Sequence, residues 1–384
     1  MTFWIPLNSD MIDKFLLFPY YWVLKTRNRR WSRPGRKFSY AEVPTLCIGN
    51  VTVGGTGKTP HVELVLRLLQ QHPDWCDKQL AVLSRGYKRD SKGFQQVTAE
   101  GSAVLYGDEP MQIKKKFPDV VVAVDKKREQ GCDLLVHPEK LKGRRWEKRC
   151  WNREFKPADY IVLDDAFQYR RLKTHKSVVL VDYNRPVQKD MLLPLGRLRD
   201  LPERIYDADA LIVSKCPAGL DDTARAAFVR DLGFTDYLPS ACEATNPKGR
   251  RQLIFFTTVY YAPAEGVYPT AEPRYTYSKK AILVTGIASD KPLCSYLSDT
   301  YQICEHFRFP DHHRFAWKDI TRIQDAANKQ STAAVITTEK DAQRLLDCAG
   351  MPQALMERLF KVPISADFLT EEERTIFTEF ITEV

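Results

Sequence analysis

The feature that most constrains the fold of this chain is a glycine-rich segment at the end of an apolar run. Residues 44–51 form the apolar run, and residues 49–59 read GNVTVGGTGKT. Glycines in such a loop let backbone N–H groups turn toward phosphate oxygens, while the Lys58 ammonium reaches the terminal phosphates and the Thr59 hydroxyl binds Mg²⁺. The strict pattern has glycine at position 52, where this chain has Thr52. The segment still predicts a nucleotide-binding loop made by Gly54, Gly55, Thr56, Gly57, Lys58 and Thr59.

The residues after this loop predict a helix, so that strand, loop and helix occur in the required order. Pro60 stands in its first turn, and apolar residues follow at helical spacing, namely Val62, Val65, Leu66 and Leu69. Short β-rich runs then alternate with helical segments, which predicts a doubly wound parallel α/β sheet of the P-loop NTPase type. These runs lie at residues 44–51, 80–83, 120–124, 160–163, 177–181 and 210–213.

Strand–helix alternation resumes later in the chain and predicts a second, smaller α/β domain, with strands at 281–285, 301–307, 333–337 and 359–364. Between the two, a β-branched and aromatic run at 253–261 precedes a stretch rich in Pro, Ala and Glu, which indicates a β-ribbon or loop. We therefore divide the chain into an N-terminal segment, a P-loop domain, a linker and a smaller domain, at residues 1–40, 41–217, 218–278 and 279–384.

The N-terminal segment allows two interpretations. Residues 11–24 are apolar and aromatic but are interrupted by charged residues and a proline, so they are too short to span a bilayer. No basic region precedes them, which argues against a signal peptide. The segment is either an interfacial helix on an anionic membrane surface or a helix packed on the protein with a solvated charge run after it. The basic residues that follow are Lys25, Arg27, Arg29, Arg30, Arg33, Arg36 and Lys37.

Composition narrows the class of protein without selecting a function. With 384 residues, 43% of them hydrophobic and 28% charged, the chain is long enough for two globular domains. A net charge of +9 favours an anionic partner, such as a nucleotide, a nucleic acid or a phospholipid surface. The nine cysteines include no CxxC pair, which argues against a redox motif or disulfide framework and favours the cytosol.

A pair of carboxylates at a strand end predicts the metal site. Residues 160–165 read YIVLDD, so four apolar strand residues deliver Asp164 and Asp165 to the carboxyl edge of the sheet. Because adjacent carboxylates repel, a Mg²⁺ ion shared with Thr59 is a reason to place both there. The alternative is that Asp165 caps a helix.

Six short motifs, taken together and in order, resemble the series found in the tetraacyldisaccharide 4'-kinases. The resemblance runs from about residue 12 to the C-terminus. It implies transfer of a phosphate from ATP–Mg²⁺ to the 4'-hydroxyl of a tetraacylated glucosamine disaccharide 1-phosphate, in lipid A synthesis. It also implies that the protein acts at the cytoplasmic face of the bacterial inner membrane, as a peripheral or monotopic protein. The motifs are SRGY at 84–87, GDEP at 107–110, DDAFQ at 164–168, LLPLGRLR at 192–199, FPDHH at 309–313 and TTEKD at 337–341.

The resemblance assigns roles to individual residues. Asp108 of the GDEP motif matches the catalytic base and His312 its partner, although His313 stands next to it. Arg199 is expected to neutralise phosphate charge together with Lys58. Asp200 is expected to be an accessory metal or water ligand, and Asn50 and Arg85 are expected to contact substrate. Since Asp108 and His312 fall in different predicted domains, the active site is expected between them, where closure would exclude water.

Three positions depart from the family pattern. Its usual DDGFQH has become Asp164-Asp165-Ala166-Phe167-Gln168-Tyr169, which removes an imidazole at 169, and its usual Glu has become Asp200. Two rival functions stay open. A GTPase switch would need an Asn-Lys-x-Asp signature, which residues 213–217 lack. A nucleic-acid-dependent NTPase would need basic and aromatic residues to interleave, as they do only at 20–37. We therefore expect no nucleic-acid partner.

Overall fold

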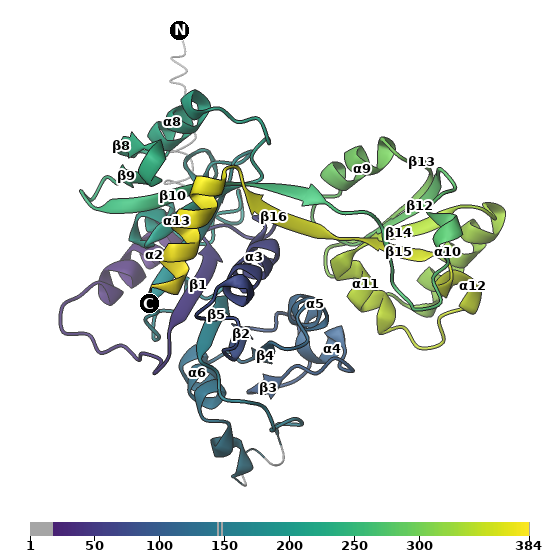
Figure 1. Cartoon of the computed structure of the whole chain (residues 1–384), viewed down its shortest axis with the longest axis horizontal. Helices are drawn as coiled ribbons and strands as arrows, with labels where there is room; N and C mark the ends of the chain where they lie inside the picture. Colours follow the sequence, from purple (N-terminus) through teal and green to yellow (C-terminus); the bar gives the residue numbers. More distant parts are fainter. Residues whose placement is uncertain (1–17, 144–145, 147–148, 384) are drawn as a thin grey trace.

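Eleven strands form the larger of two β-sheets in the computed structural model, which describes residues 18–143, 146 and 149–383 (Figure 1). The strand order is β3-β4-β2-β5-β1-β6-β7-β10-β9-β8, and β16 pairs with β10 off this path. The strands are β1 (Thr45–Asn50), β2 (Leu80–Ser84), β3 (Gln95–Gln96), β4 (Val121–Val124), β5 (Tyr160–Asp164), β6 (Lys176–Asp182), β7 (Ala210–Ser214), β8 (Thr235–Leu238), β9 (Glu243–Thr245), β10 (Arg251–Tyr261) and β16 (Ile364–Phe368).

The centre of this sheet is parallel and doubly wound, as the sequence predicts. Strands β4, β2, β5, β1, β6, β7 and β10 pair in parallel. Leu46 and Ile48 of β1 belong to one hydrophobic core, and Cys47 between them belongs to the core on the opposite face. Both faces are therefore buried. Helices α3 (Lys58–Gln71), α5 (Asp108–Lys116) and α13 (Glu371–Thr382) contribute to the first core, and α6 (Arg128–Val136) contributes to the second.

Further along the sheet, a third core lies under α2 (Phe18–Trp31) and α8 (Asp222–Asp231). Leu24 is the buried residue of α2, while Phe18, Trp22 and Val23 are exposed. Residues 1–17 of the predicted membrane-associated segment lie outside the described residues. In the part of the chain that the structure describes, no helix combines the length and the apolar character needed to cross a bilayer.

The smaller sheet has the order β11-β15-β14-β12-β13. The pairs among β15, β14, β12 and β13 are parallel, which confirms the second α/β unit. Its strands are β11 (Glu265–Gly266), β12 (Lys280–Thr285), β13 (Gln302–Arg308), β14 (Ala334–Thr338) and β15 (Leu359–Val362). Its helices are α9 (Lys291–Ser298), α10 (Trp317–Lys329), α11 (Glu339–Leu346) and α12 (Gln353–Met356). A short α4 (Ala103–Tyr106) precedes α5, and 3₁₀ turns occur at Pro138–Lys142, Val187–Lys189, Pro202–Asp207, Pro239–Ala241 and Pro273–Tyr275.

Two long strands connect the units, as Figure 1 shows for β10 and β16. The first half of β10 pairs with β7 in the larger sheet, and its second half pairs with β16 as an antiparallel ribbon. After β16 the chain packs α13 on the larger sheet, where Phe377 and Ile381 are fully buried. Residues 364–382 thus lie against the larger unit, although they fall within the range 279–384 assigned above to the smaller domain. The domain limits themselves stay a proposal.

Candidate functional site

Glycines 54, 55 and 57 shape the loop between β1 and α3. Gly54, Gly55 and Gly57 have φ values of +70°, +69° and +83°. An added Cβ at Gly54 or Gly55 would meet nothing within 4 Å, so it is backbone conformation and not space that requires glycine there. Gly57 is the N-cap of α3, and Lys58 and the buried Thr59 occupy its first turn. The N-terminus of α3 therefore faces the loop with the polarity that favours phosphate.

The missing glycine at position 52 has a structural explanation. Thr52 forms an isolated antiparallel bridge with Leu198, and the Val53 N–H donates to the Arg197 carbonyl at 2.7 Å. The chain at Thr52 pairs like a strand, so glycine is not needed there. This pairing also holds residues 192–199 beside the phosphate loop.

Asn50 and Arg199 connect the loop to the acidic strand end. The Asn50 side chain is buried and donates from Nδ2 to the Thr56 hydroxyl at 2.6 Å. Arg199 donates from Nη2 to Asn50 Oδ1 at 2.5 Å and from Nη1 to Asp165 Oδ2 at 2.9 Å. The guanidinium of Arg199 is thus brought to the loop. The Asn50 amide, for which the sequence predicts a substrate contact, shapes the loop from inside.

The two carboxylates at the end of β5 differ strongly in proton affinity. Burial raises the pKa of Asp164 to about 7, with repulsion from Glu109 and Asp165 acting in the same direction. Burial also raises the pKa of Asp165, but Lys58, whose Nζ lies 3.9 Å away, and Arg199 outweigh it and lower the pKa to about 2. No helix begins at Asp165, so the alternative of a helix cap does not hold.

These residues fit a magnesium ion. Thr59, Asp164 and Asp165 supply only oxygen ligands, which Mg²⁺ prefers. Asp164 accepts a hydrogen bond from the Ser84 hydroxyl at 3.1 Å through Oδ2, while its buried Oδ1 has no hydrogen-bond partner among the described residues. A buried carboxylate oxygen without a donor is costly unless a cation reaches it.

A second cluster joins the two units at Asp108. This residue begins α5 of the larger unit, and His312 Nδ1 of the smaller unit lies 3.1 Å from its Oδ2. Arg344 of α11 donates to the same oxygen from Nε at 2.9 Å and also from Nη2. Burial raises the pKa of Asp108, but the hydrogen bonds from His312 and Arg344 outweigh it and lower the pKa to about 2. His313 instead pairs with Asp319 at 2.9 Å, so His312 is the partner of Asp108.

Arg344, Glu109 and Lys340 are site residues that the sequence did not single out. Lys340 of α11 pairs with Glu109 across the two units. The positive charge of Lys340 is the largest influence on Glu109 and lowers its pKa. Burial acts in the opposite direction, and Lys58 lowers the pKa further. The residue next to Asp108 therefore lies within electrostatic range of the phosphate-loop lysine. Glu109 and Lys340 lie inside the motifs at 107–110 and 337–341, so their place in these motifs could have identified them as site residues.

The two remaining predicted site residues differ in burial and in their partners. Asp200, expected as a metal or water ligand, is fully buried among side chains that hold α2: Arg27 reaches it at 3.2 Å and Asn28 at 3.1 Å. Both carboxylate oxygens are engaged there, and Arg170 and Arg204 add ion pairs at 3.6 and 3.7 Å. Arg85 directly follows Ser84, whose hydroxyl donates to Asp164, and its side chain is exposed; its contact with substrate stays a prediction.

Comparison with known proteins gives one consistent family. Residues 14–382 match the family described as LpxK, tetraacyldisaccharide-1-P 4'-kinase. Proteins named tetraacyldisaccharide 4'-kinase include one from Parabacteroides distasonis, 35% identical over 88% of this chain and 85% of that protein. Another, from Phocaeicola vulgatus, is 34% identical over 98% of this chain and 96% of that protein. Among solved structures, this chain is similar to the crystal structure of the "apo" form of LpxK from Aquifex aeolicus in complex with ATP, with a TM-score of 0.65 and 23% sequence identity. The superposition covers 96% of this chain and 98% of the Aquifex chain.

Proposed function

Because this chain belongs to the tetraacyldisaccharide-1-phosphate 4'-kinase family, we propose that it transfers the γ-phosphate of ATP to the 4'-hydroxyl of a tetraacylated glucosamine disaccharide 1-phosphate in lipid A synthesis. The observation that carries this proposal is the Asp108 cluster. A carboxylate at the start of α5 contacts His312 of the other unit, and its neighbour Glu109 is within electrostatic range of Lys58. We therefore place the acceptor hydroxyl at Asp108, next to the residue on which the phosphate-loop lysine acts electrostatically.

In the proposed reaction the 4'-oxygen forms a bond to the γ-phosphorus while the bond from that phosphorus to the β–γ bridging oxygen breaks, and ADP leaves. The hydroxyl proton passes to a carboxylate oxygen of Asp108. Because the pKa of Asp108 is about 2, this carboxylate is a weak base that accepts the proton late in the step. His312 orients it and disperses charge as the proton arrives.

The phosphate loop supplies positive charge on the opposite side of the transferred group. Lys58 at the start of α3 and the Arg199 guanidinium both contact Asp165 in this structure, 3.9 and 2.9 Å away. We assign both cations to the β- and γ-phosphates of ATP. Thr59, Asp164 and Asp165 would hold the Mg²⁺ ion, which supplies further charge neutralisation when bound. Asp200 we assign to positioning α2 through Arg27 and Asn28.

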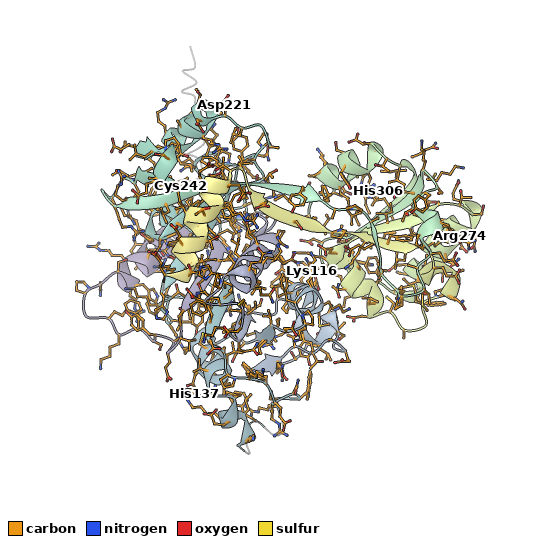
Figure 2. The ribbon with its side chains drawn as sticks, in the orientation of Figure 1. Lys116, His137, Asp221, Cys242, Arg274 and His306 are labelled. Atoms are coloured by element: carbon orange, nitrogen blue, oxygen red, sulfur yellow. The ribbon has the colours of Figure 1, made fainter. Side chains whose placement is uncertain are left out.

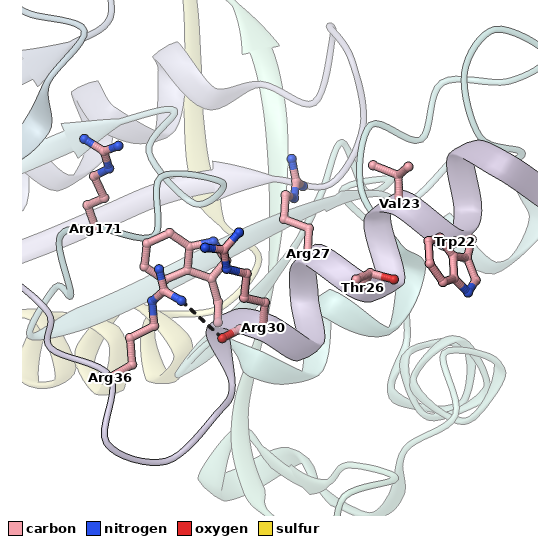
Figure 3. Close-up of a pocket in the computed structure, with 8 residues that line it drawn as sticks. Trp22, Val23, Thr26, Arg27, Arg30, Arg36 and Arg171 are labelled. Carbon is pink, nitrogen blue, oxygen red and sulfur yellow. Dashed lines mark hydrogen bonds between the residues drawn. The ribbon is translucent and has the colours of Figure 1, made fainter.

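The N-terminal helix supports engagement with an anionic membrane surface. A pocket of about 430 Å³ along α2 is lined by both arginines and apolar side chains. Figure 3 shows these side chains, with Trp22 and Val23 toward one end of the helix and Arg30 and Arg36 toward the other. The Arg36 guanidinium packs over the Trp31 ring at 3.7 Å and donates to the Arg30 carbonyl at 3.4 Å. Apolar side chains beside guanidinium groups suit the headgroup region of an anionic bilayer. The proposed location is the cytoplasmic face of the bacterial inner membrane, with peripheral attachment. The pocket is lined by Trp22, Val23, Thr26, Arg27, Arg30, Trp31, Arg36 and Arg171.

The decisive experiment is a mass measurement on the lipid. The protein is incubated with ATP, Mg²⁺ and the tetraacylated disaccharide 1-phosphate, and the product is analysed by mass spectrometry with fragmentation. We expect the mass of one added phosphate, located on the distal sugar at its 4'-oxygen. ATP hydrolysis with unmodified lipid would refute the proposal.

A further inference from the structure

A group of metal-ligating side chains lies on the smaller unit, on different elements from those that form the phosphate loop and the Asp108 cluster. Asp290 precedes α9, Cys294 lies within α9, and His306 lies on β13, the edge strand of the smaller sheet (Figure 2 labels His306). One ligand atom from each residue lies within 4.8 Å of the other two. His306 Nε2 is 3.2 Å from Asp290 Oδ2. All three residues are partly buried, so a cation could enter from solvent.

The spacing and chemistry of these atoms suit a tetrahedral ion. Bonds of about 2.0–2.3 Å to oxygen, nitrogen and sulfur around tetrahedral zinc place the ligand atoms about 3.3–3.7 Å apart. The Asp290–His306 separation is already close to this range, and the 4.8 Å limit leaves only small side-chain movements for Cys294. A thiolate and an imidazole bind Zn²⁺ and disfavour Mg²⁺. We propose that Asp290, Cys294 and His306 bind one zinc ion, with water as the fourth ligand.

Two neighbouring side chains affect this site in opposite ways. The buried Thr285 hydroxyl donates to Asp290 Oδ2 at 3.1 Å, so it can orient that ligand from the outer side, whereas its 2.9 Å contact with His306 Nε2 would be replaced by the ion, because this nitrogen has a single lone pair. Arg308 donates from Nε to Asp290 Oδ2 at 3.0 Å and supplies a positive charge that competes with the ion. Its side chain is 68% exposed, so it is free to turn into solvent when zinc binds. A bound ion would cross-link α9 to the edge strand β13.

Cobalt(II) can replace zinc as a spectroscopic probe of this site. The full chain, without nucleotide and in excess Mg²⁺, is titrated with Co²⁺ and followed by the thiolate-to-cobalt charge-transfer band in the near ultraviolet. We expect one Co²⁺ per chain, displaced by one equivalent of Zn²⁺. The band falls to background in Cys294→Ser. His306→Gln weakens binding by more than the about 10–100-fold that loss of an outer-sphere partner typically costs, because one of three protein ligands is gone.

The matched control is Cys304→Ser, because Cys304 also lies on β13 and, among the residues that the structure describes, belongs to no such group. This variant keeps the wild-type band and affinity. Arg308→Gln removes the competing charge and tightens Co²⁺ binding on the order of fivefold. The proposal is overturned if the wild-type protein shows no thiolate band, if Cys294→Ser retains it, or if His306→Gln binds as tightly as wild type. Because the readout is metal binding, its outcome is independent of kinase activity.

Discussion

Asp108 is a carboxylate held ionised by two neighbours from another part of the chain. Its pKa of about 2 reflects His312 and Arg344, whose hydrogen bonds outweigh the opposing effect of burial. At neutral pH the group is ready to accept a hydrogen bond from a hydroxyl, but it is a poor base. Orientation of the hydroxyl, followed by late proton transfer, is therefore the contribution that this residue can make to phosphoryl transfer.

Replacing the base should slow the reaction without weakening nucleotide binding. Asp108→Ala is expected to lower kcat about 10²–10⁴-fold, the usual contribution of a general base. ATP affinity should be unchanged, because the phosphate loop at residues 49–59 does not include this side chain. Single-turnover kinetics and equilibrium ATP binding separate the two effects. Near-normal turnover of the variant at saturating substrate would show that Asp108 is not the base.

Arg344 should set the acid limit of activity through the pKa of Asp108. Arg344→Gln removes a hydrogen bond and a positive charge that lower this pKa, so the pKa of Asp108 rises. Asp108 then becomes protonated at a higher pH than in the wild type. The acid limb of the kcat/KM profile therefore shifts to higher pH by about 1–3 units. Arg251→Gln is the control, since Arg251 of β10 pairs at the surface with Glu243 of β9 at 2.7 Å. An acid limb that stays in place in Arg344→Gln would contradict this coupling.

At the scale of elements, the sequence predicts the parallel strands but not the antiparallel strand β16, with which the chain returns to the larger sheet. Buried strands such as β2 and β5 read as continuous apolar runs, because helices cover both faces. The pairing of β16 with β10 is an antiparallel contact between residues more than 100 positions apart, and no local pattern encodes it. The same holds for Asp200, where the residue type suggests a metal ligand but the fold surrounds it with arginines from three segments.

The helix after the phosphate loop is tied to the connecting strand β10 by His61. Its Nδ1 lies 2.7 Å from the Gly57 carbonyl, which can only accept, so Nδ1 carries the hydrogen. Nε2 then accepts from the Thr257 hydroxyl at 2.8 Å. Burial is the main reason that the pKa of His61 falls to about 4.

This buried neutral histidine should make the fold sensitive to acid. Because the pKa of His61 is lower in the folded than in the unfolded chain, the unfolded chain binds a proton first as pH drops from 6.5 to 4. Stability is present in full above pH 6.5 and falls by about 3 kcal/mol across this window. His61→Gln should lose this part of the pH dependence, measured by urea unfolding at several pH values. His72→Gln at the other end of α3 should keep it, and equal slopes in both variants would reject the argument.

The exposed side of α2 should carry part of the affinity for membranes. Trp22 and Val23 are 59% and 56% exposed, and burying them in lipid headgroups stabilises the bound state by about 2–3 kcal/mol. The double variant Trp22→Ser/Val23→Ser should therefore bind anionic vesicles at least about tenfold more weakly in co-sedimentation. Trp317→Ser is the control, because Trp317 on α10 is equally exposed at 59%. Equal losses in the two variants would remove α2 from the proposed membrane contact.

At the scale of the whole molecule, charged contacts join the two units beside the ribbon of β10 and β16. Figure 2 shows Lys116 between the units. Its Nζ lies 2.8 Å from Glu63 of α3 in the larger unit and 2.8 Å from Glu339 of α11 in the smaller one. The Ile364 N–H, at the start of β16, also donates to Glu339 at 3.0 Å. The interface, the ribbon and the helix after the phosphate loop thus meet at one buried ionic group.

Removing the cation from this group should destabilise the molecule more than any surface lysine would. The side chains of Glu63 and Glu339 are 0% and 5% exposed, so Lys116→Met leaves two buried carboxylates without their counter-ion. We expect a loss of about 3–5 kcal/mol in the free energy of unfolding at pH 7.5. Lys115→Ala, on the same helix but exposed, should change it by less than about 0.5 kcal/mol. Neutralising the carboxylates in Lys116→Met/Glu63→Gln/Glu339→Gln should recover most of the loss, because the penalty comes from unpaired buried charge. A triple variant no more stable than Lys116→Met would show that packing of the lysine stem, and not charge, holds the two units together here.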